Sequence, residues 1–155
     1  MGKPDICLEV GSASHGGQNA RILERYEAIL IEHRPGAVIV IGDVNSTVAC
    51  TLAAAKLGIF TVHLEAGLRS FDRGMPEELN RMVTDVLVDL LWTPSPDGDE
   101  HLRAMGVPEE RIDRVGNIMI DTLVSMLPSV EAKEHWRTYE VPQHGYAVVT
   151  LHRPS

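Results

Sequence analysis

The sequence is poor in cysteine, in aromatic residues and in basic residues, and it has no long hydrophobic run. Only Cys7 and Cys50 occur among its 155 residues, so a disulfide framework is excluded and a reduced, cytoplasmic protein is expected. Aromatic residues make up 5% of the chain, and 22 Asp and Glu outnumber 14 Lys and Arg, for a net charge of -8. This acidic balance disfavours nucleic acid and anionic membrane surfaces as partners.

The hydrophobic segments are too short for a membrane but frequent enough for a core. The longest uninterrupted segment, Ala37–Ile41, falls far short of the ~20 residues that a spanning helix needs. No basic segment precedes an apolar one near the N-terminus, so no signal peptide is expected. Hydrophobic residues make up 44% of the chain, which is typical of a globular protein, and the length suits a single domain.

Apolar segments alternate with segments of helical periodicity. Strands are expected at 37–41, 59–64, 91–93, 112–115 and 146–151, the first of them buried on both faces. Helices are expected at 22–31, 47–57, 99–105, 118–127 and 131–139, and a further one opens at Pro76 with a stripe of Leu79, Val83, Val86, Leu87 and Leu90. This alternation predicts an α/β fold, a doubly wound parallel sheet of right-handed βαβ units.

The two ends of this pattern differ from those of a complete sheet. The first residues do not supply the usual opening strand with its phosphate-binding turn, and no helix follows the last expected strand. We therefore expect a fragment of a longer protein, incomplete at both ends.

Polar groups follow four of the expected strands, at Asp43, Glu65, Asn117 and His152. In an open α/β sheet, ligands bind beyond the carboxyl ends of the strands. Glu77 opens a helix shortly after the second of these positions. Three carboxylates and one histidine are therefore expected to converge on one crevice.

Each of these groups also has a purely structural explanation. Asp43 can cap the following helix, Glu77 can favour the dipole of a first helical turn, and His152 can simply be hydrogen-bonded. Glu65 has the stronger functional interpretation, because it directly follows a buried strand and has a glycine, Gly67, close beside it in the sequence. A salt bridge with Arg69 would also account for it.

Motifs for metals and common cofactors are missing from the sequence. His63 and Glu65 stand as His-x-Glu, but the Pro-Cys-x-x-Cys half of a zinc deaminase is absent. Neither HExxH, GxSxG, Walker A nor GxGxxG occurs. No metal and no cofactor is expected.

Five motifs together resemble a known family, the non-hydrolysing UDP-N-acetylglucosamine 2-epimerases. Their order and spacing match that family from about Pro4 to Ser155, most closely the branch that includes epimerases of oxidised UDP-sugars. The motifs are Gly42-Asp43-Val44-Asn45-Ser46-Thr47, His63-Leu64-Glu65-Ala66-Gly67-Leu68-Arg69-Ser70, Met75-Pro76-Glu77-Glu78-x-Asn80-Arg81, Gly116-Asn117 with Asp121, and His152-Arg153.

The resemblance implies a Rossmann-like half of a glycosyltransferase-B-type fold. Residues 1–140 would form most of the N-terminal Rossmann-like domain, without its first strand, together with the crossover. Residues 141–155 would supply the first strand of a truncated C-terminal UDP-binding domain. The resemblance further implies a UDP-sugar as substrate, a homodimer for the full-length protein, and no turnover by the truncated chain itself.

The resemblance also implies a reaction. The family inverts carbon 2 of the sugar by anti elimination of UDP to a 2-acetamidoglucal, followed by readdition of UDP with a proton delivered to the other face. Asp43, Glu65 and Glu77 would be the acid and base carboxylates of this reaction, and His152 would face the diphosphate. The expected substrate-binding residues are Arg69, Arg81, Asn117 and Arg153.

Other functions fit parts of the pattern. A non-catalytic sugar-nucleotide-binding module would keep the cleft without turnover, and a hydrolysing epimerase or a glycosyltransferase would share the fold. A phosphoacceptor receiver domain also places an aspartate, here Asp43, after a central strand. It requires an acidic pair after the first strand and a lysine after the last, and neither is evident.

Overall fold

The computed structural model describes residues 3–142 and 145–151. These residues form two compact units, the first ending at Gly116 and the second beginning at Asn117. The boundary expected after residue 140, where a further domain would begin, stays a prediction.

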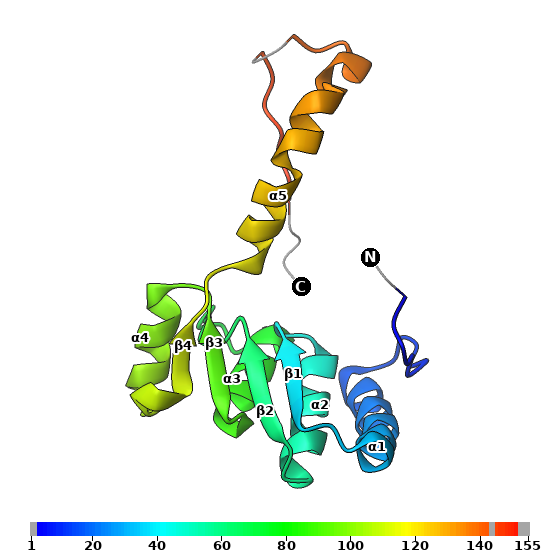
Figure 1. Ribbon diagram of the computed structural model, residues 1–155, viewed down its shortest axis with the longest axis vertical. Helices are drawn as coiled ribbons and strands as arrows, with labels where there is room; N and C mark the ends of the chain where they lie inside the picture. Colours follow the sequence, from blue (N-terminus) through cyan, green and yellow to red (C-terminus); the bar gives the residue numbers. More distant parts are fainter. Residues whose placement is uncertain (1–2, 143–144, 152–155) are drawn as a thin grey trace. The chain divides into compact units, whose positions relative to one another are not determined.

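The first unit is built on a parallel four-stranded sheet in the order β1-β2-β3-β4 (Figure 1). Its strands are β1 (Ala37–Ile41), β2 (Phe60–Leu64), β3 (Leu90–Thr93) and β4 (Ile112–Arg114). Its helices are α1 (His15–His33), α2 (Asn45–Lys56), α3 (Pro76–Leu87), α4 (Pro96–Ala104) and the short η1 (Glu109–Arg111). The α/β class and the parallel sheet predicted from the sequence are therefore confirmed.

Local signals set the ends of the helices. The Ser14 side chain accepts a hydrogen bond from the Gly17 N–H at 3.3 Å and caps α1, which runs well beyond the expected residues 22–31. Proline opens both α3 and α4, where its missing N–H costs nothing. Gly58 and Gly106 follow α2 and α4 with positive φ angles, as expected where a chain leaves a helix.

The core of the first unit lies on one face of the sheet. Val38 and Val40 of β1 are buried against a cluster that includes Leu30 of α1 and Ala53 of α2. The alternate residue Ile39 is 55% exposed, so the prediction that β1 is buried on both faces is wrong. Because sequential strands joined by right-handed crossovers place their helices on one side, the described helices of this unit cover only that side.

The apolar stripe expected on α3 also points the wrong way. Leu79, Val83 and Val86 are 42%, 45% and 64% exposed. The residues that α3 buries are instead polar, namely Glu78, Asn80, Thr84 and Asp85. Periodicity therefore identified the helix correctly, but hydrophobicity assigned its buried face wrongly, because polar contacts occupy the inner side.

The second unit contains α5 (Ile118–Lys133) and the short η2 (His135–Tyr139). The helix expected at residues 131–139 is thus the end of α5 followed by a 3-10 turn. No strand forms at Tyr146–Leu151, and Val148 and Val149 are 80% and 77% exposed, so this predicted strand is wrong. A strand needs a hydrogen-bonded neighbour, and the described part of this unit offers none.

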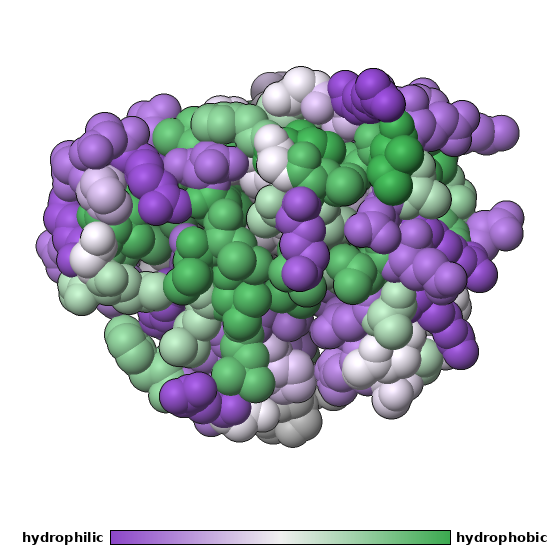
Figure 2. Space-filling model, turned by 90° about the horizontal axis from the view of Figure 1, so that it is seen from below, coloured by the Kyte–Doolittle hydropathy of each residue, from purple (hydrophilic) through white to green (hydrophobic). Residues whose placement is uncertain are grey.

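Hydrophobic side chains also reach the surface. Figure 2 shows hydrophobic residues gathered among hydrophilic ones on the face seen from below. Phe60 at the start of β2 and Ile31 in α1 are 49% and 55% exposed. Within the part of the chain that the structure describes, no helix combines the length and the apolar character needed to cross a membrane.

Candidate functional site

The turn after β1 is the centre of the candidate site. Gly42 adopts a φ of 67°, and its N–H donates a hydrogen bond to the Leu64 carbonyl at 3.0 Å. A Cβ at Gly42 would lie 3.6 Å from Oε2 of Glu65, so that carboxylate lies directly over the turn. Asp43 and Glu65 therefore follow neighbouring strands and lie at the same edge of the sheet, as the sequence predicts.

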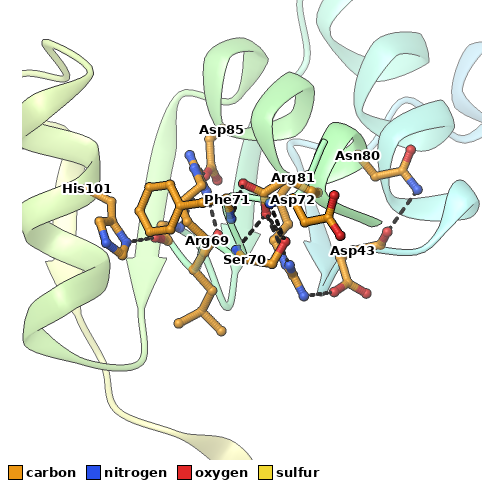
Figure 3. A network of polar contacts seen from close by, with 12 residues as sticks. Asp43, Arg69, Ser70, Phe71, Asp72, Asn80, Arg81, Asp85 and His101 are labelled. Atoms are coloured by element: carbon orange, nitrogen blue, oxygen red, sulfur yellow. Dashed lines mark hydrogen bonds and ion pairs between the residues drawn. The ribbon is translucent and has the colours of Figure 1, made fainter. Parts of the chain in front are cut away.

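Two residues of α3 hold Asp43 in place (Figure 3). The Arg81 guanidinium forms an ion pair with the Asp43 carboxylate, and the Asn80 side-chain amide donates to the Asp43 carbonyl at 2.9 Å. The side chains of Asp43 and Arg81 are 27% and 20% exposed. The carboxylate is thus fixed in direction but still open to a ligand.

The backbone, rather than a side-chain partner, sets the position of Glu65. Its φ of 74° lies in the left-handed region, which a residue other than glycine adopts at a cost. The N–H groups of Glu65 and Ala66 both donate to the Trp92 carbonyl at 3.1 Å, which ties the strained residue to β3. Strain of this kind often accompanies functional positions.

The two adjacent glutamates at the start of α3 have different surroundings. Glu78 is buried and accepts hydrogen bonds from the Ser70 N–H at 2.8 Å and the Phe71 N–H at 3.3 Å. Desolvation raises the pKa of Glu78, but these hydrogen bonds, the Ser70 hydroxyl and the charge of Arg69 outweigh it and leave that pKa below its ordinary value. Glu78 therefore fixes the loop before α3.

Glu77, by contrast, presents a buried oxygen without a partner. Among the described residues, no group forms a hydrogen bond with its Oε2. Glu77 also lines a pocket of about 510 Å³, within the size range of small-molecule sites. A buried carboxylate oxygen without a partner is unusual in a folded protein, and here it belongs to a side chain that lines a pocket.

The same pocket contains polar residues that the sequence reasoning missed. The Asn45 side-chain amide donates to Oε1 of Gln18 at 2.7 Å and lies 3.1 Å from Nδ1 of His15. Asn80 donates to Oδ1 of Asn45 at 3.3 Å. His15 and Gln18 begin α1 after a glycine- and serine-rich segment that matched no phosphate motif, so only their place at a helix start could have indicated them.

Arg69 is not positioned like a residue that contacts a ligand in this pocket. Its side chain is 5% exposed and forms an ion pair with the buried Asp85 at 2.6 Å. Its guanidinium also donates to the Leu68 carbonyl at 2.7 Å. The structure thus places Arg69 inside the protein, while Asp43, Glu65 and Arg81 lie at the turn after β1 and Glu77 lines the pocket next to it.

The remaining predicted site residues belong to the second unit or lie outside the described residues. The Asn117 side chain caps α5 by accepting a hydrogen bond from the Met119 N–H at 2.9 Å. His152 and Arg153 fall outside the described residues. Across residues 3–142 and 145–151, no cluster of three or more His, Cys, Asp or Glu side chains is arranged to hold a metal ion.

Comparison with known proteins gives a consistent result. A model of the family described as UDP-N-acetylglucosamine 2-epimerase matches residues 1–155. A UDP-N-acetylglucosamine 2-epimerase homolog of Methanococcus maripaludis is 42% identical over 152 residues, and the corresponding enzyme of Methanocaldococcus jannaschii is 39% identical over 153. Both alignments cover 97% of this chain and 42% of the relative. The chain thus spans less than half the length of these curated relatives.

Solved structures agree with the sequence relatives. The M. jannaschii UDP-GlcNAc 2-epimerase in complex with UDP-GlcNAc and UDP matches with a TM-score of 0.84 and 39% identity. The Neisseria meningitidis enzyme bound to UDP-GlcNAc matches with a TM-score of 0.82 and 30% identity. These matches cover 90% and 89% of this chain and 38% of each solved chain.

Proposed function

The chain belongs to the UDP-N-acetylglucosamine 2-epimerase family, and from this premise we propose that the whole protein interconverts UDP-N-acetylglucosamine and UDP-N-acetylmannosamine. The observation that carries the proposal is the position of Asp43 and Glu65 at one turn, with Glu77 lining the pocket next to that turn. Relatives of known structure bind UDP-GlcNAc, which supports a UDP-sugar as ligand.

The proposed reaction needs a base, an acid and a stabilised leaving group. A carboxylate removes the proton from carbon 2, the C1–O bond to UDP breaks with its electron pair, and a C1=C2 double bond forms. A second carboxylic acid then protonates carbon 2 on the opposite face while UDP adds back to carbon 1. Electrons and atoms balance without an external oxidant or reductant, so the reaction needs no redox cofactor.

The three carboxylates differ in ways that suit an acid–base set. The ion pair with Arg81 holds the Asp43 carboxylate in one direction while leaving it partly exposed, which suits it to meet a proton of the substrate. Glu77 lines the neighbouring pocket and has one buried oxygen without a partner in the described structure, which suits it to the second acid–base role. Glu65 is held by strained backbone and completes the set at the edge of the sheet. Arg81 acts in this scheme by orienting Asp43 as well as by contacting substrate.

Residues after the first unit would complete the nucleotide site. We assign the departing diphosphate to His152 and Arg153, where cationic groups stabilise developing negative charge. Asn117 would contact the sugar nucleotide, and Arg69 would support the carboxylates from inside the loop rather than touch substrate. Each assignment rests on the motif match described above.

We further propose that the whole protein is a cytoplasmic homodimer. The exposed apolar side of α3, with Leu79, Val83 and Val86, supports an interface on this unit. Both cysteines are free thiols, which fits a reducing compartment. Burial raises the pKa of Cys50 to about 11, so this thiol stays protonated and unreactive near neutral pH.

One relative favours a second substrate. The UDP-2,3-diacetamido-2,3-dideoxy-D-glucuronate 2-epimerase of Pseudomonas aeruginosa is 36% identical over 153 residues. The relatives named for UDP-N-acetylglucosamine are somewhat more similar, so that substrate stands first. The same carboxylates would serve either sugar, because both reactions invert carbon 2.

The test uses the protein encoded by the complete gene and follows UDP-N-acetylglucosamine by proton NMR. We expect the manno epimer to appear, and we expect Asp43→Asn, Glu65→Gln and Glu77→Gln each to lower turnover by at least ~100-fold, the usual cost of losing a general acid or base. Asp113→Asn, which removes an exposed carboxylate from β4, is the matched control and should retain turnover.

The outcomes separate the candidate functions. Release of free N-acetylmannosamine instead of UDP-N-acetylmannosamine would identify a hydrolysing epimerase. Binding of UDP-N-acetylglucosamine without conversion would indicate a non-catalytic sugar-nucleotide-binding module. Wild-type turnover in all three carboxylate variants would refute their roles as acids and bases.

A further inference from the structure

A buried histidine connects the elements that carry the candidate carboxylates. His63 lies in β2, and its side chain is 0% exposed. Its Nδ1 is 2.6 Å from Oδ1 of Asp85 in α3, and its Nε2 is 2.8 Å from the Gly42 carbonyl in the turn after β1. The ring therefore joins β1, β2 and α3, which carry Asp43, Glu65 and Glu77 at or just past their ends.

The partners of the ring determine its protons. A carbonyl oxygen can only accept, so Nε2 must donate its proton to Gly42. Oδ2 of Asp85 forms an ion pair with the Arg69 guanidinium at 2.6 Å and accepts a hydrogen bond from the Gly67 N–H at 3.2 Å. A carboxylate paired in this way can only accept, so Nδ1 also donates.

Resting on the proposed function, we propose that His63 is a positioning residue for the reaction, with a proton on both ring nitrogens. It holds the Gly42 carbonyl, and so the turn that carries Asp43, in register with the end of β2 that carries Glu65. Asp85 anchors the ring to α3, and Arg69 neutralises the second oxygen of Asp85. His63 does not touch substrate in this scheme.

Both oxygens of the buried Asp85 carboxylate have a partner in this cluster. The ring faces one oxygen and the Arg69 guanidinium faces the other. Such groups are tolerated inside a protein only when each is paired and hydrogen-bonded. A neutral side chain with one donor would leave either Asp85 or the Gly42 carbonyl unsatisfied, which explains why an imidazole occupies this strand position.

The first test measures which ring nitrogens of His63 carry a proton. Complete protein labelled with 15N-histidine is examined by NMR at pH 7, and His63 is identified by the signals lost in His63→Gln. We expect two ring N–H correlations from His63. A single N–H, or a ring nitrogen with the chemical shift of an unprotonated site, would overturn the proposal.

The second test separates positioning from general stability. His63→Gln and Asp85→Asn should lower kcat by ~100-fold, the effect of a misplacement of about 1 Å, while KM changes little. Val88→Ala removes buried volume at the end of α3 without touching the cluster, and it should keep its kcat. Equal loss of kcat in Val88→Ala and His63→Gln would refute a positioning role.

Failure of the proposed function would be visible separately. If the wild-type protein shows no epimerisation, the ring spectrum still reports the protons of His63. The hydrogen-exchange rate of the Gly42 N–H then tests whether His63 fixes the turn after β1. This N–H donates a hydrogen bond to the Leu64 carbonyl, and the bond should open more often when the turn is free to move. Faster exchange in His63→Gln than in Val88→Ala is expected, and equal exchange in the two would refute the proposal.

Discussion

Gly67→Ala should destabilise the first unit much more than the same change at other glycines with similar backbone angles. Gly67 follows β2 with a φ of 79°, and a Cβ there would lie 2.8 Å from the carbonyl carbon and 2.9 Å from the Cα of Gly98, with the Gly98 oxygen closer still. These atoms belong to the first turn of α4 and cannot rotate away. Alanine at this position must therefore push the loop and the helix apart.

The magnitude follows from two separable effects. A left-handed backbone costs a residue other than glycine about 1–2 kcal/mol. Forcing extra atoms into a packed site typically costs about 1–3 kcal/mol more. Gly58 and Gly106 adopt φ angles of 68° and 82° but have no atom within 4 Å of a Cβ, so alanine at either meets only the first effect. Gly67→Ala should therefore lose roughly 2–5 kcal/mol and the controls about 1–2 kcal/mol.

The assay is urea unfolding of the chain, followed by the fluorescence of Trp92 in a background where the other tryptophan, Trp136, is replaced by Phe. Trp92 lies in β3 and reports the first unit. The same loss of unfolding free energy in Gly67→Ala, Gly58→Ala and Gly106→Ala would show that the close approach to Gly98 is not rigid. Because Gly67 also donates to Asp85, its variant should in addition disturb the cluster around His63.

Two further predictions concern acid stability and the activity of the chain alone. Since the pKa of Glu78 is lowered on folding, its ionised form stabilises the fold above the ordinary glutamate pKa, and this stability is lost as the pH falls through the folded-state value. Glu78→Gln should thus cost on the order of 1–3 kcal/mol at pH 7, and the difference from wild type should close in urea titrations below about pH 4. Residues 1–155 alone, which span 42% of the M. maripaludis relative, should give no manno epimer by NMR, and steady conversion above the no-protein rate would contradict this.

The sequence predicted most accurately those elements whose apolar pattern and flanking residues both indicate the same secondary structure. An apolar run bounded by Pro35-Gly36 and Gly42 fixes β1 almost to the residue, because five hydrophobic residues between breakers fit only a strand in an α/β chain. It could not show that Ile39 and Ile41 are exposed, because the cover of a sheet face depends on which helices pack there. The strand predicted at 146–151 does not form for a similar reason. A segment becomes a strand only when a neighbouring strand pairs with it, and the segment's own sequence does not show whether such a neighbour exists.

The sequence predicts those residues of the candidate site that directly follow the end of a strand. It misses the residues whose role depends on contacts between elements far apart in the sequence. Asp43 and Glu65 stand at the carboxyl ends of neighbouring parallel strands, so topology alone brings them together. His63 was considered only as a possible metal ligand, because a histidine within an apolar strand gives no sign of its partners. Those partners, Gly42 and Asp85, lie 21 and 22 residues away and become visible only in the fold.

The reversed polarity of α3 links the fold to its function. A surface helix normally buries its apolar stripe, and α3 instead turns Glu78, Asn80 and Asp85 inward. Each of these side chains holds a different segment: Glu78 the loop at Ser70, Asn80 the Asp43 carbonyl, and Asp85 the β2 histidine. Polar contacts are directional where apolar packing is not, so they fix loop positions that a hydrophobic interface would leave adjustable. The helix therefore carries Glu77, holds Asp43 through Asn80 and Arg81, and anchors the strand before Glu65 through His63, while its hydrophobic side is left for another surface to cover.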